Sequence, residues 1–259
     1  MKLSKSFGQI FLHDKKYVGK IIDALEIEGE VVVEIGPGSG IMTAKLIKKA
    51  KKLLCIEYDP RFYKLLNQRY KGHPIVEIIR ADVLKFSLSK FKKKVVVFGN
   101  IPYHISNRLI HYLIENRKKI KRVYLTLQKE FADKLSASAS TKAFSFLSCY
   151  LQYYASVMKL FDIPAGAFLP KPKVDSSFVK IDFYEKLPFL AKNEDFLFNL
   201  MRKAFMNRRK KITNSLPALK DKRMFLSSLG ISPESRPQNL SVSDFVGLAN
   251  KLLQLSPKK

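Results

Sequence analysis

Residues 31–40 read Val-Val-Val-Glu-Ile-Gly-Pro-Gly-Ser-Gly. An apolar, β-branched run from Val31 to Ile35 that ends at a cluster of glycines is typical of a buried parallel strand. Residues 41–49 follow with apolar side chains at helical spacing. The stretch therefore predicts a strand, a glycine turn and a helix in succession, which is the repeating unit of an α/β fold.

The same alternation continues toward the carboxyl terminus. Further strands are predicted at residues 53–57, 75–79, 95–98 and 122–127, and further helices at residues 60–70 and 105–114. Regular alternation of this kind indicates a mostly parallel sheet that is covered by helices on both faces.

The pattern changes after residue 128. An aromatic-rich helix is predicted at residues 141–154, and strands at 157–161 and 176–184 flank a proline-rich loop. With no helix between them, these two strands should pair antiparallel at one sheet edge. Only helical patterns follow residue 189. We therefore expect an α/β domain over residues 1–186 and a small all-helical domain over residues 187–259.

The charge of the chain points to a polyanionic partner. The 259 residues include 48 basic and 22 acidic ones, a formal charge of +26. An excess of this size favours nucleic acid over an acidic membrane surface, since no amphipathic membrane helix is evident. A lysine-rich bias that merely keeps the protein soluble is the alternative.

Composition also narrows the class of protein. A hydrophobic fraction of 46% excludes a disordered chain. No apolar run approaches the roughly 18 residues of a membrane helix, and the N-terminal segment lacks the apolar core of a signal peptide. Cys55 and Cys149 indicate no disulfide framework, and the four histidines show no metal-ligand spacing. We expect a soluble cytoplasmic protein that uses no metal.

The glycine turn is the first candidate site. Gly36 and Gly38 allow a ligand to approach the backbone closely, and Glu57 stands 21 residues after Gly36 at the end of the second strand. An acid at that position can accept hydrogen bonds from both ribose hydroxyls of a nucleoside cofactor. A tight structural turn with a solvated acid is the alternative.

The spacing of the turn distinguishes between cofactors. A dinucleotide site has the pattern G-x-G-x-x-G, whereas Gly36 to Gly40 read G-x-G-x-G. This resembles the first motif of the class I S-adenosylmethionine-dependent methyltransferases, which implies a Rossmann-like fold and S-adenosyl-L-methionine as cofactor. Asp82, after the third strand, matches the family position that contacts the adenine amino group.

The second candidate site is Gly99-Asn100-Ile101-Pro102-Tyr103, directly after the fourth strand. It resembles the motif of methyltransferases that act on exocyclic amino groups. The Asn100 side-chain oxygen and a following backbone carbonyl can accept the two N–H bonds of an adenine N6, which aims its lone pair at the methyl donor. Tyr103 can stack on the base. An ordinary turn after a strand is the alternative.

Two further segments are candidates for contacts with the substrate. The proline-stiffened loop from Phe168 to Ser176 could place Phe168 on the other face of the target base, although Phe168 could equally fill the core beneath the loop. The basic run of Arg208, Arg209, Lys210 and Lys211 could contact phosphates without reading sequence, or could be a solvated helix face.

Together these segments resemble the small-subunit ribosomal RNA adenine N6,N6-dimethyltransferases, the kasugamycin-sensitivity family, over nearly the whole chain. The matching segments are residues 7–12, 34–40, 128–130, 168–176 and 207–216. The resemblance implies two methyl transfers to N6 of each of two neighbouring adenosines near the 3′ end of the rRNA, in an assembling subunit. We expect the enzyme to act as a monomer.

The resemblance also assigns residues. It implies that Leu12, Gly36, Gly38, Glu57, Asp82 and Asn100 contact the cofactor and that Asn100, Tyr103 and Phe168 hold the target adenine. Two positions depart from the family pattern. Ile10 replaces an Asn expected near the methionine end of the cofactor, and His104 replaces a frequent Asn.

Three alternative functions remain. The macrolide-resistance methyltransferases of large-subunit rRNA share most of the fold, but the run from Asn207 to Leu216 favours the small-subunit enzymes. A catalytically idle assembly or transcription factor on this fold is disfavoured by the intact glycine turn and Asn100 motif. A DNA adenine methyltransferase is disfavoured because 259 residues leave no room for a separate target-recognition domain.

Overall fold

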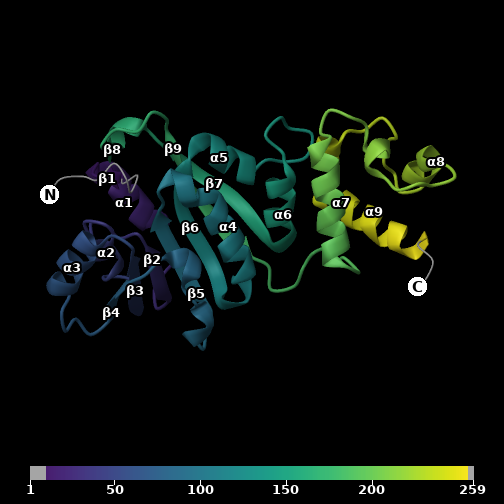
Figure 1. The fold of residues 1–259 in the computed structure, drawn as a ribbon. Helices are drawn as coiled ribbons and strands as arrows, with labels where there is room; N and C mark the ends of the chain where they lie inside the picture. Colours follow the sequence, from purple (N-terminus) through teal and green to yellow (C-terminus); the bar gives the residue numbers. More distant parts are fainter. Residues whose placement is uncertain (1–9, 256–259) are drawn as a thin grey trace. The chain divides into compact units, whose positions relative to one another are not determined.

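The computed structural model describes residues 10–255 (Figure 1). Its strands are β1 (Phe11–Leu12), β2 (Val31–Ile35), β3 (Lys52–Glu57), β4 (Val76–Arg80), β5 (Val95–Asn100), β6 (Ile120–Gln128), β7 (Ala155–Ile163), β8 (Phe168–Leu169) and β9 (Ser176–Phe183). Its α-helices are α1 (Lys15–Ala24), α2 (Thr43–Leu46), α3 (Pro60–Arg69), α4 (Ser106–Glu115), α5 (Lys129–Leu135), α6 (Phe146–Tyr154), α7 (Glu194–Met206), α8 (Lys222–Ser227) and α9 (Val242–Leu255).

Seven strands form one sheet in the order β4-β3-β2-β5-β6-β9-β7. The pairs from β4 through β6 are parallel, and β9 runs antiparallel to β6. The structure confirms the expected class I methyltransferase fold, with its antiparallel edge. The strand order reverses between β2 and β5, and ligands bind in such sheets at the carboxyl ends of the strands flanking this point.

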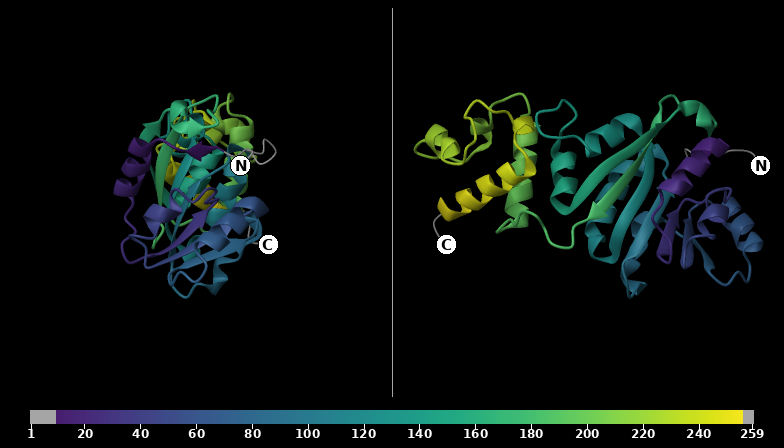
Figure 2. Two further views of the ribbon diagram at one scale, coloured as in Figure 1. Left: turned by 90° about the vertical axis from the view of Figure 1, so that its left-hand side faces the viewer. Right: turned by 180° about the vertical axis from the view of Figure 1, so that it is seen from behind.

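Helices cover both faces of the sheet (Figures 1 and 2). Helix α1 packs on the face that carries Val32, Leu53 and Phe98, all of which are buried. Helix α4 lies on the opposite face, in front of the strands in Figure 1. The central strands β2, β3 and β5 are largely apolar because both of their faces are buried.

The chain divides into two compact units by contact density. One comprises the residues up to Ala132 together with Val157–Phe183, and the other comprises Asp133–Ser156 together with the residues from Tyr184 onward. The sequence pattern places all of residues 1–186 in the first unit, whereas this division puts Asp133–Ser156 in the second. Within the second unit, the rings of Tyr150 and Tyr153 on α6 pack edge-on against Phe198 of α7, with centroid distances of 4.8 and 5.4 Å. These aromatic contacts pack α6 against α7, and the Tyr154 hydroxyl adds a 2.6 Å hydrogen bond to Glu194 at the start of α7.

Several predicted elements have different bounds from those expected. The helix expected at residues 41–49 is reduced to the four residues of α2. The helix expected at residues 141–154 begins only at Phe146, because a capping box between Ser145 and Ser148 fixes its first turn there. None of the helices in the described chain has the length and apolar character that crossing a bilayer requires.

A small two-stranded sheet was not predicted. Strand β1 pairs antiparallel with β8, with Leu12 opposite Phe168 and Phe11 opposite Leu169. The His13 N–H donates to the carbonyl oxygen of Ala167 at 3.0 Å and extends this pairing. The N-terminal segment is thereby fixed to the loop that carries Phe168. The first residues of the N-terminal motif, 7–9, lie outside the described residues.

Candidate active site

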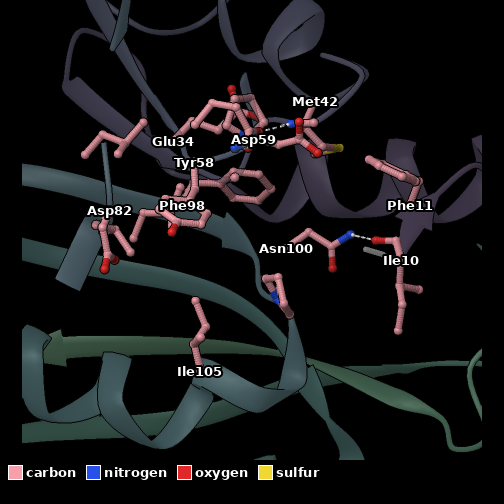
Figure 3. Close-up of a pocket in the computed structure, with 18 of the residues that line it drawn as sticks. Ile10, Phe11, Glu34, Met42, Tyr58, Asp59, Asp82, Phe98, Asn100 and Ile105 are labelled. Carbon is pink, nitrogen blue, oxygen red and sulfur yellow. Dashed lines mark hydrogen bonds between the residues drawn. The ribbon is translucent and has the colours of Figure 1, made fainter. Parts of the chain in front are cut away.

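A cavity of about 520 Å³ opens at the carboxyl ends of β2, β3 and β5 (Figure 3). This volume is in the range of small-molecule and cofactor sites. All six residues expected to contact the cofactor line it, namely Leu12, Gly36, Gly38, Glu57, Asp82 and Asn100. The structure thus brings together residues from five separate segments of the chain.

The glycine turn forms one wall of this cavity. Gly36 and Gly38 have φ values of +65° and +54°, which side chains rarely allow. A Cβ added to Gly38 would lie 2.5 Å from Cε1 of Phe11. Glycine is required at residue 38 for two reasons, the backbone conformation and the close approach of β1.

Glu57 ends β3 and is 5% exposed. Its Oε2 accepts a hydrogen bond from the Gly38 N–H at 3.0 Å, and its Oε1 accepts one from the Asp59 N–H at 2.7 Å. Burial raises the pKa of this carboxyl, while hydrogen bonds from the backbone N–H groups of Asp59, Gly38 and Tyr58 lower it. An ionised carboxylate has about four acceptor positions, so the group can still accept a ligand hydroxyl.

Glu34 lies beneath the glycine turn, and the sequence analysis gave it no role of its own. Its carboxylate accepts hydrogen bonds from Thr43 Oγ1 at 2.7 Å and from Cys55 Sγ at 3.4 Å. Burial raises the pKa of Glu34 to about 7. Because Thr43 begins α2, this contact ties the end of β2 to the helix after the turn. The acid at the head of the glycine motif was the available signal for this role.

Asp82 and Tyr58 stand at another part of the cavity wall (Figure 3). Asp82 Oδ1 accepts a hydrogen bond from the Leu84 N–H at 3.0 Å, and its Oδ2 has no hydrogen-bond partner in the described part of the chain. Tyr58 directly follows Glu57, and 62% of its surface is exposed. This aromatic ring is a cavity residue that the sequence motifs did not single out, although its position next to Glu57 was a signal.

Asn100 ends β5 and lies beside the N-terminal segment. Its Nδ2 donates a hydrogen bond to the carbonyl oxygen of Ile10 at 3.3 Å, and Figure 3 shows the amide oxygen turned away from Ile10. The Ile101 N–H donates to the Thr126 carbonyl on β6 at 3.4 Å, which fixes the next residue of the motif. Among residues 10–255, no donor to the amide oxygen of Asn100 is found, so this oxygen can accept a hydrogen bond from a ligand.

Tyr103 and Phe168 do not line the cavity. The Tyr103 hydroxyl shares a 2.8 Å hydrogen bond with Ser176 Oγ, so the motif after β5 is joined to the end of the proline-rich loop. Burial raises the pKa of Tyr103. Phe168 is 2% exposed and belongs to the core cluster with Leu12 and Phe178. The ring of Phe168 therefore fills the core beneath the loop and does not face the cavity.

The basic run lies in the second unit. The sequence pattern predicts a helix over this run. In the structure, residues 207–211 instead form an irregular turn after α7. Arg208 is half-buried, Arg209 and Lys210 are exposed, and Lys211 forms an ion pair with Glu234. Four adjacent cations in the sequence thus have three different environments.

A family model described as ribosomal RNA adenine dimethylase matches residues 1–254. The ribosomal RNA small subunit methyltransferases A of Vibrio atlanticus and Legionella pneumophila are each 38% identical to the chain. The Vibrio alignment covers 97% of this chain and 94% of the relative. The Legionella alignment covers 95% and 96%.

Two solved structures are similar over most of their length. A dimethyladenosine transferase from Plasmodium falciparum has a TM-score of 0.78 at 30% identity, and the alignment covers 95% of this chain and 96% of that one. The 23S rRNA methyltransferase ErmE has a TM-score of 0.79 at 24% identity over 94% and 100% of the two chains. The similarity to ErmE shows the shared fold.

Proposed function

The chain belongs to the ribosomal RNA adenine dimethylase family, and on that basis we propose that it transfers methyl groups from S-adenosylmethionine to N6 of two adjacent adenosines near the 3′ end of small-subunit rRNA. The proposed substrate is an assembling small subunit, on which the enzyme acts as a monomer in the cytoplasm. One observation carries the proposal. Glu57, from the cofactor motif, and Asn100, from the motif for an exocyclic amino group, line the same cavity.

The residues of the cavity fit S-adenosylmethionine. The Glu57 carboxylate can accept hydrogen bonds from the ribose hydroxyls, and the Asp82 Oδ2 can accept one from an adenine amino group. Gly36 and Gly38 have positive φ values and no Cβ, so a ligand can approach the backbone of the turn closely. Leu12, from β1, contributes an apolar wall. When bound, the cofactor supplies a sulfonium-activated methyl group.

We propose that the backbone of Ile10 orients the amide of Asn100. Because Nδ2 donates to the Ile10 carbonyl, Oδ1 is the end of the amide that is presented to an incoming base. This oxygen and the carbonyl of Ile101 or Pro102 would accept the two N6–H bonds and aim the N6 lone pair toward the methyl donor. Positioning of this kind replaces a strong general base, since the methyl donor is already activated.

Tyr103 would stack on the target adenine. Its hydroxyl bond to Ser176 holds the ring at the edge of the motif. Phe168 could contact the base only after its ring leaves the core cluster, in which it is buried. The aromatic faces would compensate for the stacking that the adenine loses when it leaves the RNA helix.

In the second unit, Arg208, Arg209, Lys210 and Lys211 are proposed to contact rRNA phosphates. Charge supports this proposal, since the chain carries 48 basic and 22 acidic residues. Phosphate contacts would position the RNA without reading its sequence.

Labelled methyl donor, supplied with immature small or large ribosomal subunits, tests the proposed substrate. We expect label on N6 of adenines in the small subunit alone. Label on the large subunit would instead indicate the macrolide-resistance activity. The absence of label on both, with the protein bound to subunits, would indicate a non-catalytic assembly factor.

A further inference from the structure

Residues 128–130 form one of the segments that match the family, yet the proposed chemistry gives them no role. They lie where β6 ends, and helix α5 begins at Lys129. The Lys129 side chain forms an ion pair with Asp162 on β7, and its Nζ lies 2.7 Å from Oδ2. This segment is therefore joined to the strand at the edge of the sheet.

Asp162 connects the ends of three strands. Besides pairing with Lys129, its carboxylate accepts a 2.7 Å hydrogen bond from Ser177 Oγ on β9, and Lys159 Nζ lies 3.5 Å from Oδ1. The hydrogen bonds from Lys129 and Ser177 lower the pKa of Asp162 to about 2, so this carboxylate is ionised at neutral pH. A charged acceptor with donors on two neighbouring segments holds the ends of β6, β9 and β7 together.

The start of β9 is held by further contacts. The Lys129 N–H donates to the carbonyl oxygen of Asp175 at 3.0 Å, and Asp175 Oδ1 accepts a hydrogen bond from the Ala165 N–H at 2.9 Å. Ser176 and Ser177, which follow, have no exposed surface. Residues 175–177 are thus fixed both by the first residue of α5 and by the turn that follows β7.

Ser176 connects this segment to the motif after β5. Its Oγ shares a 2.8 Å hydrogen bond with the hydroxyl of Tyr103. Ser176 and Ser177 are consecutive residues of one strand, so their side chains point to opposite faces of the sheet. A contact that fixes Ser177 therefore also fixes the direction of Ser176. Asp162 is linked in this way to the Tyr103 hydroxyl through two adjacent residues of β9.

We propose that Asp162 and Lys129 are positioning residues for methyl transfer, which hold the ring of Tyr103 in the orientation that stacks on the target adenine. The inference rests on the proposed function, in which Tyr103 contacts that base. Neither Asp162 nor Lys129 lines the cofactor cavity, so cofactor binding does not depend on them. The alternative is an ion pair that belongs only to the sheet edge, where such exposed pairs contribute little to stability.

The test compares Asp162→Asn with a matched control, Asp182→Asn, in the full-length protein. The side chains of Asp162 and Asp182 are 38% and 35% exposed, and both lie on the antiparallel strands of the sheet. Asp182 also pairs with two cations, Arg122 and Lys180. The two variants therefore lose the same charge and a similar ion pair, but only Asp162 is linked to Tyr103. Thermal unfolding reports whether each variant is folded.

The orientation of the Tyr103 ring can be observed without any substrate. NMR of protein with isotope-labelled tyrosine reports on all 11 tyrosines, and the signal that Tyr103→Phe removes belongs to Tyr103. We expect Asp162→Asn and Lys129→Met to shift this signal and Asp182→Asn to leave it in place. A Tyr103 signal that is unchanged in Asp162→Asn would overturn the inference, whatever the protein methylates.

Single-turnover methylation of small subunits at saturating cofactor measures the consequence for the reaction. We expect the rate to fall about tenfold in Asp162→Asn and Lys129→Met, the effect of about one hydrogen bond lost from the reactive geometry. Lys129→Arg keeps the charge and should retain most of the rate. Cofactor affinity should be unchanged in all three variants and in the Asp182→Asn control, whose rate should equal that of the wild type.

A double variant shows whether Asp162 acts through Tyr103. Tyr103→Phe keeps the ring and removes the hydroxyl, so adding Asp162→Asn to it should slow methyl transfer no further. Additive losses, or a wild-type rate in Asp162→Asn alone, would overturn the inference. A wild-type protein that places no label on small subunits would instead refute the proposed function, and the Tyr103 signal would still test the link to Asp162.

Discussion

Replacement of Glu57 with alanine should abolish most of the affinity for S-adenosylmethionine. Both carboxylate oxygens already accept backbone N–H groups, from Gly38 and Asp59, and the carboxylate can also accept hydrogen bonds from the ribose hydroxyls. A hydrogen bond to a charged acceptor contributes about 1.5–3 kcal/mol. Since water partly solvates the hydroxyls in the variant, we expect a loss of about 2–4 kcal/mol, or roughly 30- to 700-fold in affinity.

The same substitution should also lower stability. Two buried N–H groups lose their acceptor, and each such group costs about 1–3 kcal/mol unless water replaces the carboxylate. Glu57→Gln separates the two effects, because the amide keeps one acceptor oxygen but cannot serve both N–H groups. We expect its affinity to lie between those of the wild type and Glu57→Ala.

Calorimetric titration with the cofactor measures the affinities, and thermal unfolding reports whether each variant is folded. Glu77→Gln is the matched control, because Glu77 is a carboxylate on β4 that pairs with Lys52 and Lys90 outside the cavity. A folded Glu57→Ala protein whose affinity is within twofold of the control would refute the role proposed for Glu57.

Three other substitutions test neighbouring parts of the site. Gly38→Ala should weaken cofactor binding and stability together, because its Cβ would meet the Phe11 ring at 2.5 Å and the φ of +54° is strained; unchanged calorimetry and melting would contradict this. Asn100→Asp should slow methyl transfer by about 100-fold at neutral pH, because a carboxylate cannot donate to Ile10. Its rate relative to wild type should rise as the pH falls and the acid becomes protonated; a constant ratio would oppose this orientation. For Glu34, the pKa is about 7 in the fold and near 4.5 when unfolded, so the folded state binds the extra proton and stability should fall by about 3 kcal/mol as the pH rises between these values. Glu34→Gln should remove this pH dependence of stability in thermal melts. A pH profile identical to that of the wild type would contradict the assignment of the effect to Glu34.

The sequence predicted the sheet well because its strands are buried on both faces. The run Val31–Ile35 is apolar except for the buried Glu34, and the glycine turn after this run marks where the strand ends. The same turn and the acid at Glu57 located the cofactor side of the site. These are local patterns, so they can be read without knowledge of what packs against them.

Features that depend on distant partners were not predictable in this way. Strands β1 and β8 have two residues each, which is too short for any periodicity, and they exist because Leu12 and Phe168 meet in the core. The helical pattern of α6 indicated a helix but not that its tyrosines would pack on Phe198. Likewise, the basic run gave no sign that Glu234 would pair with Lys211.

Single-turnover methylation of small-subunit rRNA by the wild type and by Asn100→Ala tests the central claim most directly. Mass spectrometry of the isolated rRNA would locate the modified bases, and calorimetry would measure cofactor affinity in parallel. The account predicts two adjacent N6,N6-dimethyladenosines near the 3′ end with the wild type. With Asn100→Ala it predicts almost none, although cofactor affinity stays within about tenfold. A near-normal single-turnover rate in Asn100→Ala would contradict the claim that this amide positions the reacting nitrogen.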